Sequence, residues 1–219
     1  MKTTLMEFVM KHRLSLIVLT VALATLSGCA TMSGDECMTS DWSAIGYEDG
    51  SQGYTMDRMS KHRKACAKHG VTPNLGDYQS GRDQGLVNYC QPGRGFSVGS
   101  NGGSYKGVCS VNLEGNFLDA YNAGRHLYVL RSDVNGASSS IGNKQREIDR
   151  LDDDVARNEA ALISNETTQE ERVYLLAELK DLSERIGTLD AEIKDLYEVR
   201  ARSQVELDHY RLIVADMGY

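Results

Sequence analysis

The chain has 219 residues and a formal net charge of −7 at pH 7, with 41% hydrophobic and 7% aromatic residues. Phosphate groups repel an acidic chain, so its composition argues against binding to nucleic acids or anionic lipids, and we expect no nucleic-acid partner. With 21 glycines and few aromatic residues, the chain has limited material for one large hydrophobic core. The glycines fall mostly before residue 125, so we expect two regions of different composition.

Residues 1–28 have the pattern of a segment that is removed from the mature protein. Lys11, His12 and Arg13 precede an apolar stretch that ends at Leu26 and is far shorter than the ~20 residues of a membrane-spanning helix. The closing run Leu26-Ser27-Gly28-Cys29 resembles a bacterial lipoprotein signal. This resemblance implies cleavage before Cys29, acylation of Cys29 with chains such as palmitate, and a lipidated linker over residues 29–36.

The residue after the cysteine bears on the destination of the protein. Position 30 is Ala, where an Asp would resemble a signal for retention in the inner membrane. We therefore expect the periplasmic face of the outer membrane. Two alternatives stay open: an ordinary secretory signal with an incidental cysteine, and a translation start at Met10 in place of Met1.

The expected location also predicts the oxidation state of the other four cysteines, because the periplasm oxidises thiols. Cys37, Cys66, Cys90 and Cys109 are expected to form disulfides, and four cysteines allow three pairings. Proximity in sequence favours Cys37 with Cys66 and Cys90 with Cys109, although it does not establish the connectivity.

Residues 37–116 form a predicted Gly/Cys-rich domain with glycines at helical spacing. Gly46 with Gly50 and Gly81 with Gly85 lie one helical turn apart, so each pair would let another backbone approach closely. Tight packing in a small helical bundle stapled by disulfides is the expected reason. The alternative is a site where a ligand approaches the glycines beside three aromatic residues, Trp42, Tyr78 and Tyr105.

The segment from Gln91 to Val108 is predicted to be a loop or a short hairpin, because it is too rich in glycine for a helix. Asn101-Gly102 is a typical hairpin turn. The segment lacks the Gly-Lys-Ser/Thr ending of a phosphate-binding loop, so it does not indicate a nucleotide site.

The order of aromatic, glycine and cysteine positions between Cys37 and about Tyr128 resembles the YfiL-like family of Gram-negative lipoproteins, a domain of unknown function. The positions that carry the resemblance are Cys37, Asp41-Trp42, Ile45-Gly46-Tyr47, Asp49-Gly50, Arg63, Ala65-Cys66, Gly70, Tyr78, Gly81-Arg82, Gly85-Leu86, Tyr89-Cys90, Pro92, Gly95, Gly99, Tyr105, Gly107-Val108-Cys109, Phe117, Tyr121 and Gly124. The resemblance implies a lipid-anchored envelope domain, often with a helical tail, and assigns no catalytic residue.

Two heptad patterns predict a coiled coil in the rest of the chain. The first arm is expected over residues 117–164, a turn over 165–170 and the second arm over 171–216. Hydrophobic positions recur every seven residues at Leu127, Val134, Ile141, Ile148, Val155 and Leu162, and again at Leu175, Leu182, Leu189 and Leu196. An antiparallel hairpin whose turn is centred on Thr168 and Gln169 would join the two patterns; a continuous helix that dimerises is the alternative.

Two features should affect the stability and the register of this hairpin. The run Asn135-Gly136-Ala137-Ser138-Ser139-Ser140 predicts a loosened or kinked helix in the first arm. Lys144, Asn158 and Arg200 fall on the seam, where polar residues favour one register or extend to solvent.

Candidate chemistry is sparse. His62, Cys66 and His69 would share a helical face and could bind a metal, but a disulfide explains Cys66 better. Asp152-Asp153-Asp154 lacks the glycine-bearing pattern of a calcium loop. We identify no catalytic residue, metal site or cofactor, and we expect that the protein is not an enzyme.

These observations predict a mainly α fold: a small Gly-rich, disulfide-stapled helical domain with a short loop or hairpin, followed by a long antiparallel coiled-coil hairpin. The predicted function is that of a non-enzymatic outer-membrane lipoprotein with a structural or adaptor role. Its partners would be the membrane, through the lipid anchor, and an envelope protein or a second copy, through the coiled coil. The alternative is a periplasmic ligand-binding module or enzyme that uses the Gly-rich aromatic domain.

Overall fold

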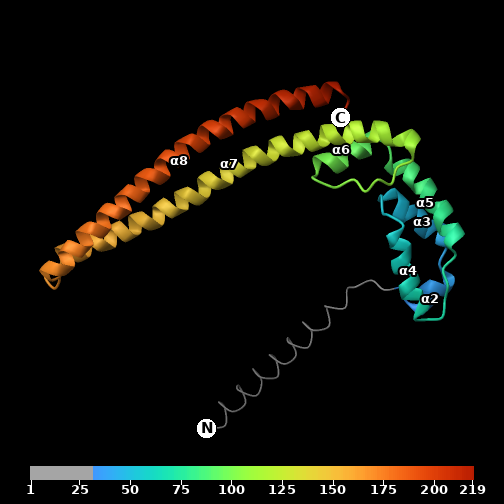
Figure 1. The fold of residues 1–219 in the computed structure, drawn as a ribbon, viewed down its shortest axis with the longest axis horizontal. Coiled ribbons are helices and arrows are strands. Elements are labelled where there is room, and N and C mark those ends of the chain that lie inside the picture. The colour runs from blue at the N-terminus through green and yellow to red at the C-terminus, as the bar shows by residue number, and fades with distance from the viewer. Residues whose placement is uncertain (1–31) are drawn as a thin grey trace, which may run out of the picture. The chain divides into compact units, whose positions relative to one another are not determined.

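The computed structural model describes residues 32–219, so the signal segment 1–28, the lipidation residue Cys29 and the start of the linker lie outside the described residues. The described part of the chain contains helices and no strand, which confirms the mainly α fold (Figure 1). The helices are α2 (Gly34–Thr39), α3 (Trp42–Ser51), α4 (Asp57–Ala67), α5 (Leu75–Tyr89), α6 (Pro92–Ser100), α7 (Val111–Ile163) and α8 (Gln169–Asp216).

The helices form two compact units. The first unit contains the described residues up to Gly50 together with Tyr54–Asp83, and the second contains Ser51–Gly53 with Gln84–Tyr219. The Gly/Cys-rich region predicted as one domain over 37–116 is therefore divided between the two units, and its second part shares a unit with the long helices.

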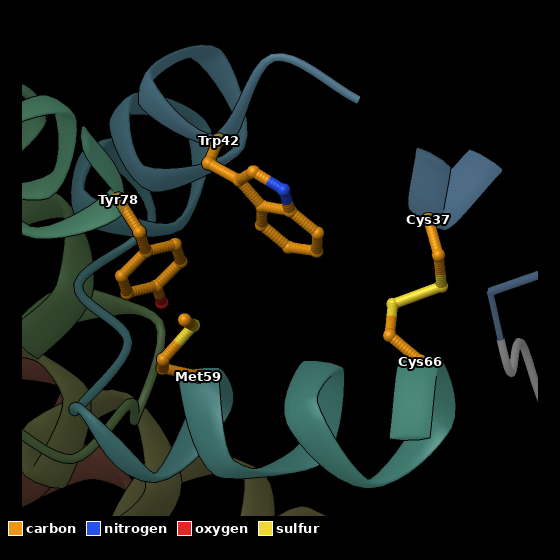
Figure 2. Packing of buried hydrophobic residues seen from close by; sticks show 5 residues of the cluster. All are labelled: Cys37, Trp42, Met59, Cys66 and Tyr78. Atoms are coloured by element: carbon orange, nitrogen blue, oxygen red, sulfur yellow. A yellow bond between two sulfur atoms is a disulfide. The ribbon is translucent and has the colours of Figure 1, made fainter. Parts of the chain in front are cut away.

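The core of the first unit is built around a disulfide and two large aromatic rings (Figure 2). Cys37 of α2 is bonded to Cys66 of α4, with 5.5 Å between their Cα atoms. Trp42 of α3, Met59 of α4 and Tyr78 of α5 complete the cluster, and Tyr78 is fully buried. The favoured pairing of Cys37 with Cys66 is thus present.

The folded part of the first unit begins earlier than the predicted linker allows. Met32 packs against this core, and Ser33 caps α2 in a capping box with Glu36. Each capping partner satisfies a free backbone N–H of the other at the helix start, so α2 is well defined from its first turn. The linker predicted over 29–36 therefore ends before Met32.

The second unit has its own core beside the second disulfide. Cys90 is bonded to Cys109, and Leu86, Tyr89 and Phe117 pack around them. The second favoured pairing is therefore also present. Tyr105 lies against the Phe117 ring with 4.8 Å between ring centroids.

Helix α6 occupies part of the segment that the sequence predicted as a loop or hairpin, so that prediction was wrong for residues 92–100. The glycines face another helix: a Cβ atom on Gly99 would lie 2.1 Å from the carbonyl oxygen of Tyr121, and one on Gly95 would lie 2.4 Å from that of Phe117. Close packing against α7 thus offsets the low helix propensity of glycine. Gly102, with φ of +76°, turns the chain just after α6 ends.

The α3–α5 and α6–α7 helix pairs use the same contacts. A Cβ on Gly46 would meet the carbonyl oxygen of Tyr78 and the amide nitrogen of Arg82. A Cβ on Gly99 would meet the same atoms of Tyr121 and Arg125. In the opposite direction, Gly81 faces the carbonyl of Ser43 as Gly124 faces that of Phe96, so the two pairs are equivalent.

Sequence spacing extends this equivalence to the disulfides. The first cysteine precedes its glycine by nine residues in both cases (Cys37 to Gly46, Cys90 to Gly99), and the second cysteine precedes its tyrosine by twelve (Cys66 to Tyr78, Cys109 to Tyr121). Residues 37–82 and 90–125 are therefore an internal repeat. The disulfide-bonded cysteines are 29 residues apart in the first repeat and 19 in the second, because only the first contains an additional helix, α4.

Helices α7 and α8 form the predicted antiparallel hairpin (Figure 1). Its central core contains Ile141, Ile148 and Leu151 of α7 with Leu189 and Ile193 of α8. Thr168 caps α8 in a capping box with Glu171, as the sequence spacing suggested.

The hairpin departs from the expected boundaries. The first arm begins at Val111 and not at 117, because the start of α7 also packs on α6. The connection spans residues 164–168, so the turn centre predicted at Thr168 and Gln169 was wrong: Thr168 is already the N-cap and Gln169 the first helical residue. Helix α7 continues without interruption through residues 135–140, where Ala137 is buried.

Two of the predicted seam residues have identified contacts. Lys144 forms an ion pair with Glu192 across the hairpin, and Arg200 lies over the ring of Tyr197. The amide nitrogen of Asn158 is buried and has no hydrogen-bond partner within the described part of the chain.

Candidate functional site

A concave surface of the first unit lies along α4. We call the side chains of Arg58, Lys61, Lys64 and Lys68 the basic face of α4. They line a hollow of about 600 Å³ together with Met32, Glu36, His62 and Ala65. The carboxylate of Glu36 accepts a hydrogen bond from the Ser33 amide at 2.7 Å, and this bond lowers the pKa of Glu36. The hollow therefore carries an excess of positive charge.

A buried carboxylate fixes the orientation of α4 behind this hollow. Asp49 of α3 accepts a hydrogen bond from the Tyr78 hydroxyl at 2.9 Å and lies 3.0 Å from His62 Nε2. Arg58 Nε is 3.4 Å from the other carboxylate oxygen. Burial, and then the hydrogen bond to Asp49, raise the pKa of Tyr78, so its phenol stays protonated and donates to the carboxylate.

This cluster has a structural explanation. Its four polar side chains come from α3, α4 and α5: Tyr78 and His62 each form a hydrogen bond with the buried Asp49, and Arg58 adds an ion pair. In a catalytic triad the histidine of an Asp–His pair activates a nucleophile. Here the third side chain, Tyr78, donates its hydrogen bond to the carboxylate of Asp49 and not to the histidine. The arrangement therefore holds α4 against α3 and α5.

The aromatic ligand site suggested by the sequence is not assembled as expected. Trp42 and Tyr78 are core residues of the first unit, and Tyr105 belongs to the core cluster of the second. The Tyr105 hydroxyl donates to Glu114 and accepts from the Cys109 amide, so it is engaged in closing the Cys90–Cys109 loop. The three rings serve packing in two separate cores.

A second exposed feature lies at the tip of the α7–α8 hairpin. Four apolar residues there face solvent: Ile163 (81% exposed), Tyr174 (69%), Val173 (65%) and Leu176 (55%). Tyr174 also lines a hollow of about 430 Å³ with residues of the connection. We call these four residues the apolar tip.

Side-chain hydrogen bonds hold the backbone of the tip. The guanidinium group of Arg172 donates to the carbonyl oxygens of Leu162 and Ser164, which end α7, and the Thr168–Glu171 capping box begins α8. These bonds satisfy the free carbonyl and N–H groups at the two helix ends. Heptad analysis missed the apolar tip because it seeks the residues that face the partner helix and passes over those that point outward.

Within residues 32–219, no group of three His, Cys, Asp or Glu side chains is placed to hold a metal ion. Cys66, one member of the His62–Cys66–His69 candidate, is in a disulfide, and His62 is bound to Asp49. No helix in the same range is long and apolar enough to cross a membrane.

Comparison with known proteins finds a similarity for part of the chain. Residues 41–126 match a family described as "Protein of unknown function (DUF2799)". This range covers the two glycine-packed helix pairs and stops within α7, so most of the hairpin lies outside the match. Neither the curated proteins nor the solved structures include a significant match. Residues 41–126 are therefore similar to a domain of unknown function.

Proposed function

We propose that this protein is a non-enzymatic lipoprotein on the periplasmic face of the outer membrane, anchored through Cys29, that acts as an adaptor through its α7–α8 hairpin. The sequence Leu26-Ser27-Gly28-Cys29 supports the anchor, as does the resemblance to YfiL-like lipoproteins. Two disulfides in a domain of this size fit an oxidising compartment.

The observation that carries the adaptor role is the apolar tip. Exposed apolar residues that gather in one place on a soluble domain commonly mark a protein-interaction site. Here four of the exposed apolar residues lie near the connected end of a helical hairpin whose arms have 53 and 48 residues. At ~1.5 Å per residue, such arms extend roughly 70 Å, so the tip can reach a partner far from the other end of the hairpin.

The anchor is tested by metabolic labelling with palmitate. The wild-type protein is expected to take up the label and the Cys29→Ser variant to lose it, because the variant lacks the thiol that the signal would acylate. Cys90→Ser removes a different cysteine and should keep the label. Label that persists in Cys29→Ser would contradict the proposed anchor.

The adaptor role is tested by photocrosslinking in cells from a residue analogue placed at Tyr174. We expect one reproducible protein adduct, either a foreign envelope protein or a second copy of this chain. An analogue at the exposed Asp190, in the middle of the second arm, is the control and should give little adduct. Equal yields at both positions, or none at Tyr174, would reject the tip as the contact surface.

The alternative function, a ligand-binding module or enzyme that uses Trp42, Tyr78 and Tyr105, has no support from the geometry. Trp42 and Tyr78 are 8% and 0% exposed, and Tyr105 belongs to the other unit. A ligand could reach Trp42 and Tyr78 only after the first core had opened.

A further inference from the structure

Positive charge is concentrated on one helix of an acidic protein. From Arg58 to Lys68 the chain has five basic residues and no acidic residue, whereas the whole chain carries a net charge of −7. The basic residues are Arg58, Lys61, Arg63, Lys64 and Lys68. The overall charge therefore does not describe the electrostatics of α4, since charges more than ~10 Å apart in water are largely screened from one another.

The lysines of the basic face are free to bind an anion. Lys61, Lys64 and Lys68 are exposed, and none of them forms an ion pair with another described residue. Their spacing of three and four residues puts them on one side of the helix. Arg58 completes this side, while its guanidinium also approaches the buried Asp49. Phosphate groups that lie side by side on a surface could therefore contact several side chains of the basic face at once.

The covalent connection to the proposed anchor is very short. Met32 lines the same hollow as Lys61 and Lys64 and packs against the core of the first unit. Only Ala30 and Thr31 separate Met32 from Cys29, so the chain between them spans at most about 11 Å. An acylated Cys29 would therefore hold the basic face close to the lipid headgroups. This step depends on the function proposed above.

The internal repeat gives an independent indication. The second repeat forms its glycine-packed helix pair and its disulfide without any counterpart of α4. Pairing of the helices does not require such a helix, so α4 is an addition to the first repeat. Insertions into a repeated unit often lie on the face that binds a partner or a ligand.

We infer that the basic face of α4 docks on anionic phospholipid headgroups of the membrane that holds the lipid anchor. Each lysine near an anionic membrane surface strengthens binding about fivefold. A lipid chain and a cluster of basic residues together hold a protein on a membrane more firmly than either does alone. Docking would also fix which side of the first unit faces the bilayer.

The test uses the mature chain from position 29 onward with Cys29→Ser, which contains every described residue and carries no lipid. Its association is measured by flotation with phosphatidylcholine vesicles, with and without phosphatidylglycerol. We expect association with the anionic vesicles that weakens as salt is raised, and none with pure phosphatidylcholine. Equal association with both vesicle types would overturn the inference.

A triple variant locates the surface. Lys61→Gln, Lys64→Gln and Lys68→Gln together should weaken association with anionic vesicles by roughly 100-fold, since about 3 kcal/mol corresponds to two factors of ten. The matched control removes the same charge from the hairpin with Lys180→Gln, Lys194→Gln and Arg202→Gln, and should bind nearly as the parent does. Equal losses in the two triple variants would show that net charge, not the basic face, governs binding and would reject the inference.

Two further results separate the inference from related ones. Unchanged Trp42 fluorescence in the lysine variant would show that the first unit is still folded. Binding of inorganic phosphate without binding to anionic vesicles would identify a small-anion site and overturn the membrane assignment. Because this chain has no lipid, a negative result would leave the palmitate and crosslinking tests of the proposed function unaffected.

Discussion

Asp49 shows how one buried charge can organise a small unit. It is 6% exposed and is approached by Tyr78, His62 and Arg58, which come from two different helices. A buried carboxylate is costly unless hydrogen bonds and opposite charge compensate for its lost hydration. The polar contacts of Asp49 therefore restrict how α3, α4 and α5 can pack, in addition to the apolar core beside them.

Removing this carboxylate should destabilise the first unit. In Asp49→Ala the Tyr78 hydroxyl and the His62 ring lose their partner inside the core, and we expect the free energy of unfolding to fall by about 3 kcal/mol. Denaturant titration followed by Trp42 fluorescence measures the change. Asp83→Ala, at a 65%-exposed side chain that only approaches Arg82, is the control and should change stability by less than about 0.5 kcal/mol. Similar values for both variants would contradict the role assigned to Asp49.

At the scale of elements, glycine determines which helices pair. Gly46 and Gly81 on one pair of helices, and Gly99 and Gly124 on the other, leave no room for a Cβ atom because the partner backbone is in contact. Glycine is a poor helix former, so each of these positions lowers the stability of its own helix, and close packing against the partner helix compensates for this loss. The same residue elsewhere has no such role: nothing lies within 4 Å of the position that a Cβ on Gly187 of α8 would occupy.

This contrast predicts opposite signs for the same substitution. Gly81→Ala should lower stability by about 3 kcal/mol, because its Cβ would lie 1.8 Å from the Ser43 carbonyl oxygen and the helices must separate. Gly187→Ala should raise stability by up to about 1 kcal/mol through helix propensity alone. Thermal unfolding checks both, followed by Trp42 fluorescence for Gly81→Ala in the first unit and by circular dichroism for Gly187→Ala in the second. Gly124→Ala, at the equivalent position of the second repeat, should behave like Gly81→Ala, because its Cβ would lie 2.3 Å from the Phe96 carbonyl oxygen. A neutral Gly124→Ala would contradict this equivalence.

At the scale of the molecule, the two units have separate hydrophobic cores, each beside its own disulfide. The single tryptophan, Trp42, lies in the core of the first unit, whereas most helical residues belong to α7 and α8 of the second. Fluorescence and far-ultraviolet circular dichroism therefore report mainly on different units.

Equilibrium unfolding should consequently give transitions that do not coincide for the two signals, since separate cores unfold with their own free energies. Gly81→Ala should shift the fluorescence midpoint more than the circular dichroism midpoint, and Gly99→Ala should do the reverse. A single midpoint shared by both signals in all three proteins would show that the units unfold as one.

Several features could be read from local sequence. The two heptad patterns predicted the hairpin, because burying an apolar stripe on each of two helices requires that they face each other. The Thr168–Glu171 spacing indicated the start of α8, since a capping box depends only on residues three apart. Proximity also favoured the disulfide pairing that the structure contains. The repeated Tyr-x-x-Gly-Arg at Tyr78 and Tyr121 could have revealed the internal repeat.

Other features depended on contacts between distant segments. Helix α6 forms because α7 covers its glycines, and local propensity alone disfavours it. Trp42 and Tyr78 are core residues because α3, α4 and α5 close around them, which their aromatic character did not reveal. The hollow along the basic face is likewise a property of the assembled unit, because Met32 and Glu36 from a distant segment help to line it.

The sequence by itself determined the helical class and favoured the hairpin and the cysteine pairs, because periodicity, caps and short loops act between residues close in the chain. Tertiary structure decided which glycines pack, which aromatics are buried and which charges remain exposed. Those outcomes depend on long-range contacts, whose energies exceed the local preference of about 1 kcal/mol that a single residue expresses.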